Sequence, residues 1–318
     1  MRLPRSGGIC SAPRARALHR LALRGLRSLR RTCWLGVLGL GWLAQGAHAD
    51  TALHSLWALH GKHNTVYVLG SIHTLRASDY PLPAAVMDAY RNSRALVMEI
   101  NLDEIDSADV QSQMIQSAAL PPGKSLAEIL GPARYARAQG LAREVGLDLS
   151  MFDQSAPWFA AEAISQLQLM QLGFDPESGV EMYFKGLSHT DGKTIRGLET
   201  AREQIALFED MPLDQQAEYL MSSLEQARDL PKEVNDMVRA WQSGDTGWFQ
   251  SEVKSDLGRD PALYRSFVVA RNRKWIGKIE ALLDQDENYL VIVGTAHLVG
   301  DEGVIALLKK DGVGAEQR

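Results

Sequence analysis

The sequence predicts an α/β protein in which two similar strand–loop–helix units form a mixed or parallel sheet, with a large helical insertion between them. Two apolar, β-branched segments, 65–70 and 290–294, have the composition of strands that are buried on both faces. Each runs into the same short motif, Gly-x-x-His, at Gly70–His73 and at Gly294–His297. The long region between the two motifs has the spacing of apolar residues that is typical of helices.

The first unit begins with a predicted hairpin of segments 56–60 and 65–70, which are joined by turn-forming residues. After the first motif, the rigid segment Tyr80–Pro83 leads into a helix that extends to about Arg91. A third strand is expected at 95–100. The second unit repeats this order near the end of the chain, where a strand, its histidine and a further helix follow one another.

The region 110–285 is predicted to be mostly helical. A short strand interrupts it at 194–197, and Thr200 with Glu203 forms a capping-box pattern that opens the next helix. The other expected helices are a short one capped by Ser125, then Pro132–Val145, one from Ser155 to Gly173, one near Val180–Leu187, most of 204–284, and Gly303–Lys310.

The first 49 residues are predicted to be a signal peptide that is removed. Residues 1–31 carry nine arginines and no acidic residue, and the apolar stretch 33–43 that follows is too short for a stable membrane anchor. A small-x-small cleavage site lies at 47–49. We therefore expect a single mature domain, residues 50–318, in the periplasm or secreted.

Charge and cysteine content narrow the function classes. The chain has 34 basic and 39 acidic residues, and loss of the nine leader arginines leaves 25 basic residues and a net charge of about −14. Such an acidic protein is a poor candidate for binding nucleic acid or an anionic membrane. Because Cys10 and Cys33 both fall in the leader, the mature protein has no disulfide, thiolate ligand or cysteine nucleophile. The expected partner is a peptide or small-molecule substrate.

Several polar side chains are predicted to stand at the carboxyl ends of strands. His73 and His297 would share one rim if their strands are parallel neighbours, and this rim is where open α/β sheets bind ligands. Glu99 ends the third strand, where a buried carboxylate is costly unless it is paired, ligated or solvated. Each has an ordinary alternative, a hydrogen-bonded loop histidine or a salt bridge at the rim.

Three more charged residues are candidates. Glu199 follows the short strand, although its alternative is favourable placement before a helix N-terminus. Arg271, among apolar residues, could clamp a carboxylate or stabilise an oxyanion, or it could simply extend to solvent. Glu181 taken alone is an ordinary helix-face acid. Two histidines and carboxylates without a thiol suit Zn²⁺, Mn²⁺, Co²⁺ or Fe²⁺, whereas nucleophile-elbow, P-loop, dinucleotide-binding and His-Glu-x-x-His motifs are missing.

The chain resembles the TraB/GumN family. This family includes the Tiki peptidases and is distantly related to the erythromycin-esterase and ChaN-like proteins. The matching stretches are Tyr67–His73, Tyr80–Pro83, Leu96–Ile100, Gly197–Thr200, Arg271–Trp275 and Val293–Gly300. The resemblance implies an α/β fold with paired Gly-x-x-His motifs around one site, and metal-dependent hydrolysis that is peptidase-like in the Tiki branch. One departure is Thr295-Ala296, which replaces a more glycine-rich pair. The six candidate side chains stand at matching positions.

The leading hypothesis is an exported metal-dependent hydrolase, of the peptidase type, that uses Mn²⁺, Zn²⁺ or Co²⁺ to activate water. A carboxylate that is not a ligand would serve as general base. Two alternatives stay open: a protein that binds haem, iron or a small molecule without turnover, and a metal-free hydrolase in which one histidine is the general base. The expected metal ligands are His73, His297 and Glu181, and the expected catalytic groups are Glu99, Glu199 and Arg271.

Overall fold

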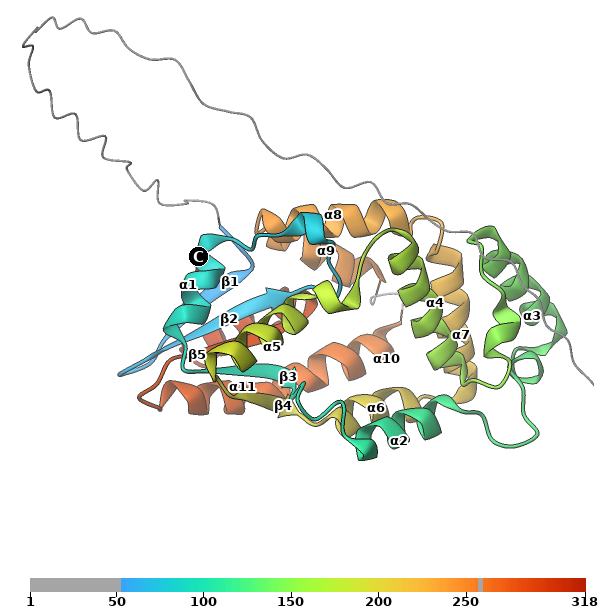
Figure 1. The fold of residues 1–318 in the computed structure, drawn as a ribbon, viewed down its shortest axis with the longest axis horizontal. Helices are drawn as coiled ribbons and strands as arrows, with labels where there is room; N and C mark the ends of the chain where they lie inside the picture. The colour runs from blue at the N-terminus through green and yellow to red at the C-terminus, as the bar shows by residue number, and fades with distance from the viewer. Residues whose placement is uncertain (1–52, 257–259) are drawn as a thin grey trace, which may run out of the picture. The chain divides into compact units, whose positions relative to one another are not determined.

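A computed structural model describes residues 53–256 and 260–318, which form an α/β fold around a six-stranded mixed sheet (Figure 1). The predicted fold class is thus confirmed. The order of strands across the sheet is β4-β3-β5-β2-β1-β6. Their bounds are β1 Leu56–His60, β2 Thr65–Ser71, β3 Ala95–Ile100, β4 Ile195–Glu199, β5 Tyr289–Gly294 and β6 Ala315–Gln317.

Four neighbouring strands, β4, β3, β5 and β2, run parallel, and β1 and β6 add antiparallel pairs at one edge. The register pairs Ser71 with Gly294 and Ile100 with Glu199. The carboxyl ends of the parallel strands therefore meet at one rim. The strands that lead into the two Gly-x-x-His motifs are parallel neighbours, so the condition for a shared rim is met.

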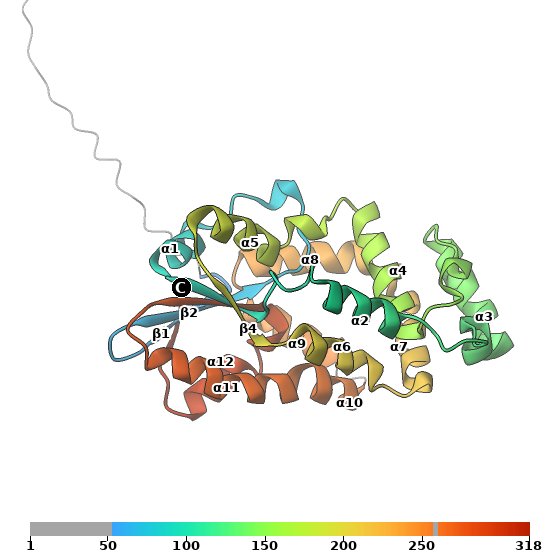
Figure 2. The same cartoon turned by 60° about the horizontal axis from the view of Figure 1, so that its bottom comes forward.

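The two faces of the sheet are covered by different helices. Alternation along β5 places Leu290 and Ile292 on one face and Val291 and Val293 on the other. The first face packs against α1, α5 and α8, and the second against α11 and α12 (Figure 2). These helices are α1 Ala84–Asn92, α5 Val180–Asp191, α8 Leu230–Gln242, α11 Ala270–Leu283 and α12 Val304–Lys310.

The remaining helices lie beyond the carboxyl ends of the parallel strands (Figure 1). Helices α3, α4 and α7 share a core of their own around Leu149, Ile164 and Leu220. The helices of this part are α2 Ala108–Ala118, α3 Leu126–Glu144, α4 Pro157–Gln171, α6 Ala201–Glu209, α7 Leu213–Gln226, α9 Thr246–Asp256 and α10 Pro261–Tyr264. Short 3-10 turns lie at Ala77–Asp79, Leu149–Phe152, Pro176–Ser178 and Thr295–His297, and a π-helical segment, η5, at Arg265–Val269.

Several helices and strands begin or end at other residues than the sequence predicted. Glu199 is the last residue of β4 and does not follow that strand. Helix α5 continues to Asp191, where Gly192 in the left-handed conformation ends it. Helix α4 begins after Ala156, which makes no side-chain cap, so Ser155 is not the cap. The predicted cap at Ser125 and the predicted capping box of Thr200 are confirmed.

Two elements were not predicted, helix α2 and strand β6. Apart from Ala118, the side chains of α2 are not fully buried, so its apolar pattern is weak. Strand β6 is a segment of three residues that forms through backbone pairing with β1. The predicted leader lies outside the described residues. In the part of the chain that the structure describes, no helix has the length and apolar character needed to cross a membrane.

Candidate functional site

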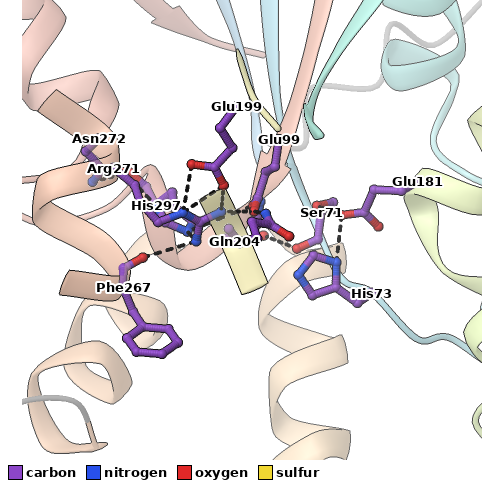
Figure 3. A network of polar contacts seen from close by, with 12 residues as sticks. Ser71, His73, Glu99, Glu181, Glu199, Gln204, Phe267, Arg271, Asn272 and His297 are labelled. Carbon is purple, nitrogen blue, oxygen red and sulfur yellow. Dashed lines mark hydrogen bonds and ion pairs between the residues drawn. The ribbon is translucent and has the colours of Figure 1, made fainter. Parts of the chain in front are cut away.

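The two Gly-x-x-His motifs interlock at the rim of the sheet. The Thr295 hydroxyl donates a hydrogen bond to the Ser71 carbonyl oxygen at 3.0 Å. A Cβ atom on Gly70 would lie only 2.8 Å from Thr295 Oγ1, so the first motif requires glycine for this close approach. The packing of adjacent parallel strands thus brings both motifs to one place (Figure 3).

The first motif places His73 against helix α5. The backbone N–H of Val180 donates to the Ile72 carbonyl, and a Cβ atom on Gly179 would lie 2.1 Å from the His73 carbonyl oxygen. The helix can approach this closely only because Gly179 has no side chain. Its first turn then presents Glu181, whose Oε1 atom lies 2.8 Å from His73 Nδ1 (Figure 3).

The pair of His73 and Glu181 has an unequal exposure. The His73 side chain is 70% exposed, whereas that of Glu181 is 12% exposed and also accepts a hydrogen bond from the Ser71 hydroxyl. The negative charge of Glu181 is the largest influence on His73 and raises the pKa of the imidazole above its ordinary value. Burial acts to raise the pKa of Glu181, but His73 and Ser71 lower it overall. Glu181 therefore stays ionised and holds the proton of His73 on Nδ1.

The second motif places its histidine in a buried position. The His297 side chain is 8% exposed, and its Nδ1 atom lies 2.7 Å from Asn272 Oδ1. The Asn272 amide nitrogen donates to the backbone carbonyls of His297 and Glu302, which leaves Oδ1 as an acceptor. His297 must then donate from Nδ1. Its Nε2 atom accepts from Arg271 Nη1 at 3.0 Å.

These contacts fix both the tautomer and the charge of His297. A guanidinium group can only donate, so a hydrogen bond from it to Nε2 requires a neutral imidazole. Burial lowers the pKa of His297 to about 4, with Glu99 acting in the opposite direction and Arg271 in the same one. The second histidine is therefore uncharged at neutral pH.

Arg271 links two buried glutamates behind this histidine. Its Nη2 atom lies 2.5 Å from Glu99 Oε2 and 2.6 Å from Glu199 Oε1, and its Nε also donates to Glu199 at 3.0 Å. The guanidinium stacks over Trp275, with its carbon 4.8 Å from the ring centroid. Its Nη1 donates to the Phe267 carbonyl of η5, so the π-helical segment contributes to holding Arg271.

Glu99 lies between this cluster and His73 (Figure 3). The backbone N–H of Gly294 donates to its Oε1 atom at 2.8 Å, and the Gln204 amide donates to Oε2 at 3.0 Å. Burial acts to raise the pKa of Glu99, but His297, Arg271, His73 and the Gly294 N–H together lower it to about 2. Glu99 is thus a carboxylate at any physiological pH, and the permanent charge of Arg271 suffices to explain this.

A small, closely bordered space lies at Gly294, where His297 Cδ2 is also within 3.6 Å of the position of a Cβ atom. A Cβ atom there would lie 3.3 Å from Glu99 Oε1 and 3.8 Å from His73 Nε2, so these two atoms border the same point. A cavity of about 260 Å³ adjoins this region. The side chains that line it are His73, Met98, Glu99, Ile100, Leu102, Pro176, Glu181, Met182 and Gln204.

The predicted metal site can be compared with these contacts. In residues 53–256 and 260–318, no three His, Cys, Asp or Glu side chains are arranged to hold a metal ion as they stand. His73 and Glu99 nevertheless face one space, and the buried Glu181 Oε2 atom has no hydrogen-bond partner. These three suit a divalent cation in type. His297 would be available only if Arg271 withdrew from its Nε2, and its role as a ligand stays a prediction.

All six candidate residues lie at this rim, in two sets of contacts: His73 with Glu181, and Arg271 with Glu99, Glu199 and His297. Three of them, His73, Glu99 and Glu181, line the cavity, whereas Arg271, Glu199 and His297 form the support behind Glu99. Three further polar residues belong to the site and were not predicted from the sequence: Ser71, Gln204 and Asn272. Ser71 lies inside the first motif and Asn272 beside Arg271, but Gln204 has no local signal, because only folding brings α6 against β3.

The chain is similar to one known family and to several uncharacterized proteins. The sequence pattern of the TraB/PrgY/gumN family matches residues 55–317. The uncharacterized protein YbaP of Escherichia coli strain K12 is 24% identical over 269 residues, which cover 80% of this chain and 97% of YbaP. An uncharacterized protein of Treponema pallidum strain Nichols is 19% identical over 283 residues, 84% of this chain and 85% of that protein. No solved structure matches the chain.

Proposed function

Since the chain belongs to the TraB/PrgY/gumN family, we propose that it is an exported hydrolase that activates water at His73 and cleaves a peptide or a related acyl substrate. One observation carries the proposal. The imidazole of His73 is oriented by Glu181 through Nδ1, and its Nε2 borders the space at Gly294 together with the carboxylate of Glu99. An oriented imidazole beside an open space is the arrangement that general-base catalysis requires.

In the proposed reaction, deprotonated His73 accepts a proton from water on Nε2 while the water oxygen forms a bond to the scissile carbonyl carbon. The imidazolium formed is stabilised by Glu181, which lies 2.8 Å from Nδ1. The proton then passes from Nε2 to the leaving amine or alcohol as the carbonyl carbon releases it. Glu99, which stays ionised, accepts the second hydrogen bond of the water and orients it.

Arg271 has a supporting role in this proposal. Its nitrogens already donate to Glu99, Glu199, Phe267 and His297, so it fixes the position and the charge of Glu99. Stabilising an oxyanion, the other role predicted for Arg271, would require one of these contacts to break. Glu199 touches Arg271 and does not line the cavity, which favours positioning over proton transfer for this residue.

A metal-dependent form of the same hydrolysis is compatible with these residues. His73 and the carboxylates of Glu99 and Glu181 would hold Mn²⁺, Zn²⁺ or Co²⁺. Such an ion, when bound, lowers the pKa of a water molecule and polarises the carbonyl. The unpartnered and buried Glu181 Oε2 favours this form, because a buried carboxylate oxygen without a partner is costly.

Elemental analysis of the purified protein after incubation with each ion separates the two forms. Near-stoichiometric metal that is lost in His73→Ala and retained in His297→Ala supports the ligand set proposed above. Metal lost in both variants supports instead the paired-histidine site expected from the sequence. Peptide hydrolysis that survives exhaustive chelation supports the metal-free form.

The substitution Gly294→Ala tests the space where water would bind. The backbone of Gly294 has φ −52° and ψ 135°, which alanine adopts readily, so the added methyl group acts mainly by occupying the space between Glu99 and His73. We expect loss of peptide hydrolysis, measured by mass spectrometry, with little change in unfolding temperature. The control is Gly277→Ala, where no atom lies within 4 Å of the added Cβ. Full activity in Gly294→Ala would refute the proposal.

Export is the part of the proposal that rests on the leader pattern, residues 1–49. The N-terminal sequence of the protein recovered from a bacterial periplasmic fraction tests it directly. A mature N-terminus at Asp50 is the expected result, and an intact chain in the cytoplasmic fraction alone would contradict it.

A further inference from the structure

A second cavity, of about 140 Å³, adjoins the cavity at His73. Its lining residues come from α2, α6, the start of α4 and the end of β3. Helices α2 and α6 lie side by side (Figures 1 and 2). The side chains that define it are Ile100, Val110, Met114, Trp158, Ile205 and Phe208. We call this the α2–α6 cavity.

The α2–α6 cavity is a neighbour of the first one, because the two cavities share two lining residues. Ile100 and Gln204 line both cavities. Gln204 also donates a hydrogen bond to Glu99 Oε2, so it stands at the junction between the second cavity and the proposed site of reaction. A ligand that occupied both cavities would pass beside Gln204 and would have Glu99 and His73 among its neighbours in the first cavity.

The chemistry of the α2–α6 cavity is apolar. None of its lining side chains is charged, and only Gln111 and Gln204 carry polar groups. Trp158 stacks on Phe208 with ring centroids 4.7 Å apart and an interplanar angle of 26°, which provides a broad apolar wall. A charged group placed here would lose its hydration without gaining an ionic partner. An aliphatic or aromatic group would gain from leaving water.

We propose that the α2–α6 cavity is a specificity subsite that receives one apolar side chain of the substrate, next to the bond that is cleaved. Its volume is small and suits a single aliphatic or aromatic side chain. The inference deepens the proposed function, because it assigns the substrate class, peptides with an apolar residue beside the scissile bond. Binding at the subsite does not itself require hydrolysis, so the two can be tested separately.

The test uses the full chain carrying His73→Ala, so that no ligand is consumed. Blocked tripeptides, acetyl-Gly-Xaa-Gly-amide with Xaa as Leu, Phe, Gly, Asp or Lys, are titrated and binding is followed by ligand-observed NMR. We expect the Leu or Phe peptide to bind at least about tenfold more tightly than the Gly, Asp and Lys peptides. Equal binding of all five peptides, or preference for a charged one, would overturn the subsite.

Two substitutions on α2 make a matched pair. In Val110→Trp the larger side chain fills the α2–α6 cavity, and we expect it to weaken the Leu peptide about tenfold while leaving the Gly peptide unchanged. Ile115→Trp adds a large side chain to the same helix at a position that is 69% exposed, and we expect no change. Equal effects of both variants would overturn the assignment.

A variant that enlarges the cavity provides a second test in case Val110→Trp does not fold. Val110→Ala removes two methyl groups from the wall and is expected to shift the preference from Leu toward Phe. An unchanged preference would count against the subsite. If the selective binding is found but the protein with His73 intact hydrolyses none of the five peptides, the subsite stands and the proposed hydrolysis fails.

Discussion

The two Gly-x-x-His motifs have nearly the same sequence and opposite surroundings. His73 is largely exposed, lies 2.8 Å from a carboxylate and has a raised pKa. His297 is buried between the Asn272 amide and the Arg271 guanidinium, and its pKa is lowered. Parallel strand pairing puts both at one rim, but helices from other parts of the chain decide what each imidazole can do. A shared motif therefore predicts location better than role.

The largest expected difference between the motifs is in catalysis. His73→Ala should lower peptide hydrolysis by about 10² to 10⁴-fold, the usual contribution of a general base, and change the free energy of unfolding by only about 1 kcal/mol. His297→Ala should destabilise the protein by about 2–4 kcal/mol, because it leaves a cavity and removes the buried acceptor of Arg271. Activity assays and urea denaturation measure the two effects. A stability loss in His73→Ala as large as that in His297→Ala would contradict the contrast.

The next effect is on stability and concerns Arg271, which contacts both Glu99 and Glu199. Arg271→Met removes the only cation that contacts both Glu99 and Glu199 within the described residues, and two buried carboxylates would lose their partner. We expect a loss of about 3–5 kcal/mol in the free energy of unfolding, measured by chemical denaturation. The control is Arg273→Met, two residues along the same helix, whose exposed ion pair with Glu302 should contribute less than about 1 kcal/mol. Equal losses in both variants would refute the supporting role.

The sequence predicted the sheet and the meeting of the six candidate residues because these depend on local patterns. Buried β-branched runs that end in Gly-x-x-His mark parallel strands and a common rim, and the structure has both. It did not predict the separation of roles. Nothing near His297 in the sequence indicates that Asn272 and Arg271 occupy its two nitrogens, since these contacts form only when α11 packs against the sheet.

Strand β6 and residue Gln204 were missed for a related reason. Strand β6, Ala315–Gln317, forms because β1 offers a backbone edge to pair with, and a segment of three residues has no periodicity that could predict this. Gln204 was read only as part of a capped helix, and its contact with Glu99 spans 105 positions of the chain. Contacts between distant segments are set by packing, so residues that act through them need the fold before they can be recognised.

The third prediction concerns how the buried His297 makes the free energy of unfolding depend on pH. An unfolded histidine takes up its proton near pH 6.5, whereas His297 in the folded protein does so only near pH 4. The unfolded state therefore binds more protons between these values, and the free energy of unfolding should fall by about 3 kcal/mol as the pH drops from 6.5 to 4. Glu99, whose ordinary pKa is 4.5, adds to the fall mainly below about pH 5, so the part between pH 6.5 and about pH 5.5 reports chiefly on His297.

The control for the acid effect is His297→Gln. This variant should be less stable at pH 7, because its side chain does not reproduce both hydrogen bonds, yet its stability should change less between pH 6.5 and pH 4.5. Denaturation curves at a series of pH values measure the slope. The same slope in the variant and in the original protein would show that another group causes the acid sensitivity.

The smallest effect on stability is expected from the exposed His73. It has the opposite sign, because stability falls as the pH rises. Because Glu181 raises the pKa of His73, the folded state holds that proton longer than the unfolded state as pH rises. This contribution to stability is complete below pH 6.5 and is lost as pH rises through the raised pKa. Hydrolysis should increase over the same range, since the general base must be deprotonated.

Glu181→Gln should shift both changes toward pH 6.5, as followed by activity and by NMR titration of His73. The control is Glu177→Gln, at an exposed residue of the preceding turn, which should shift neither. A titration of His73 that does not respond to Glu181→Gln would mean that the first motif, like the second, is governed by Arg271 and Glu99, and the contrast between the two histidines would be one of exposure alone.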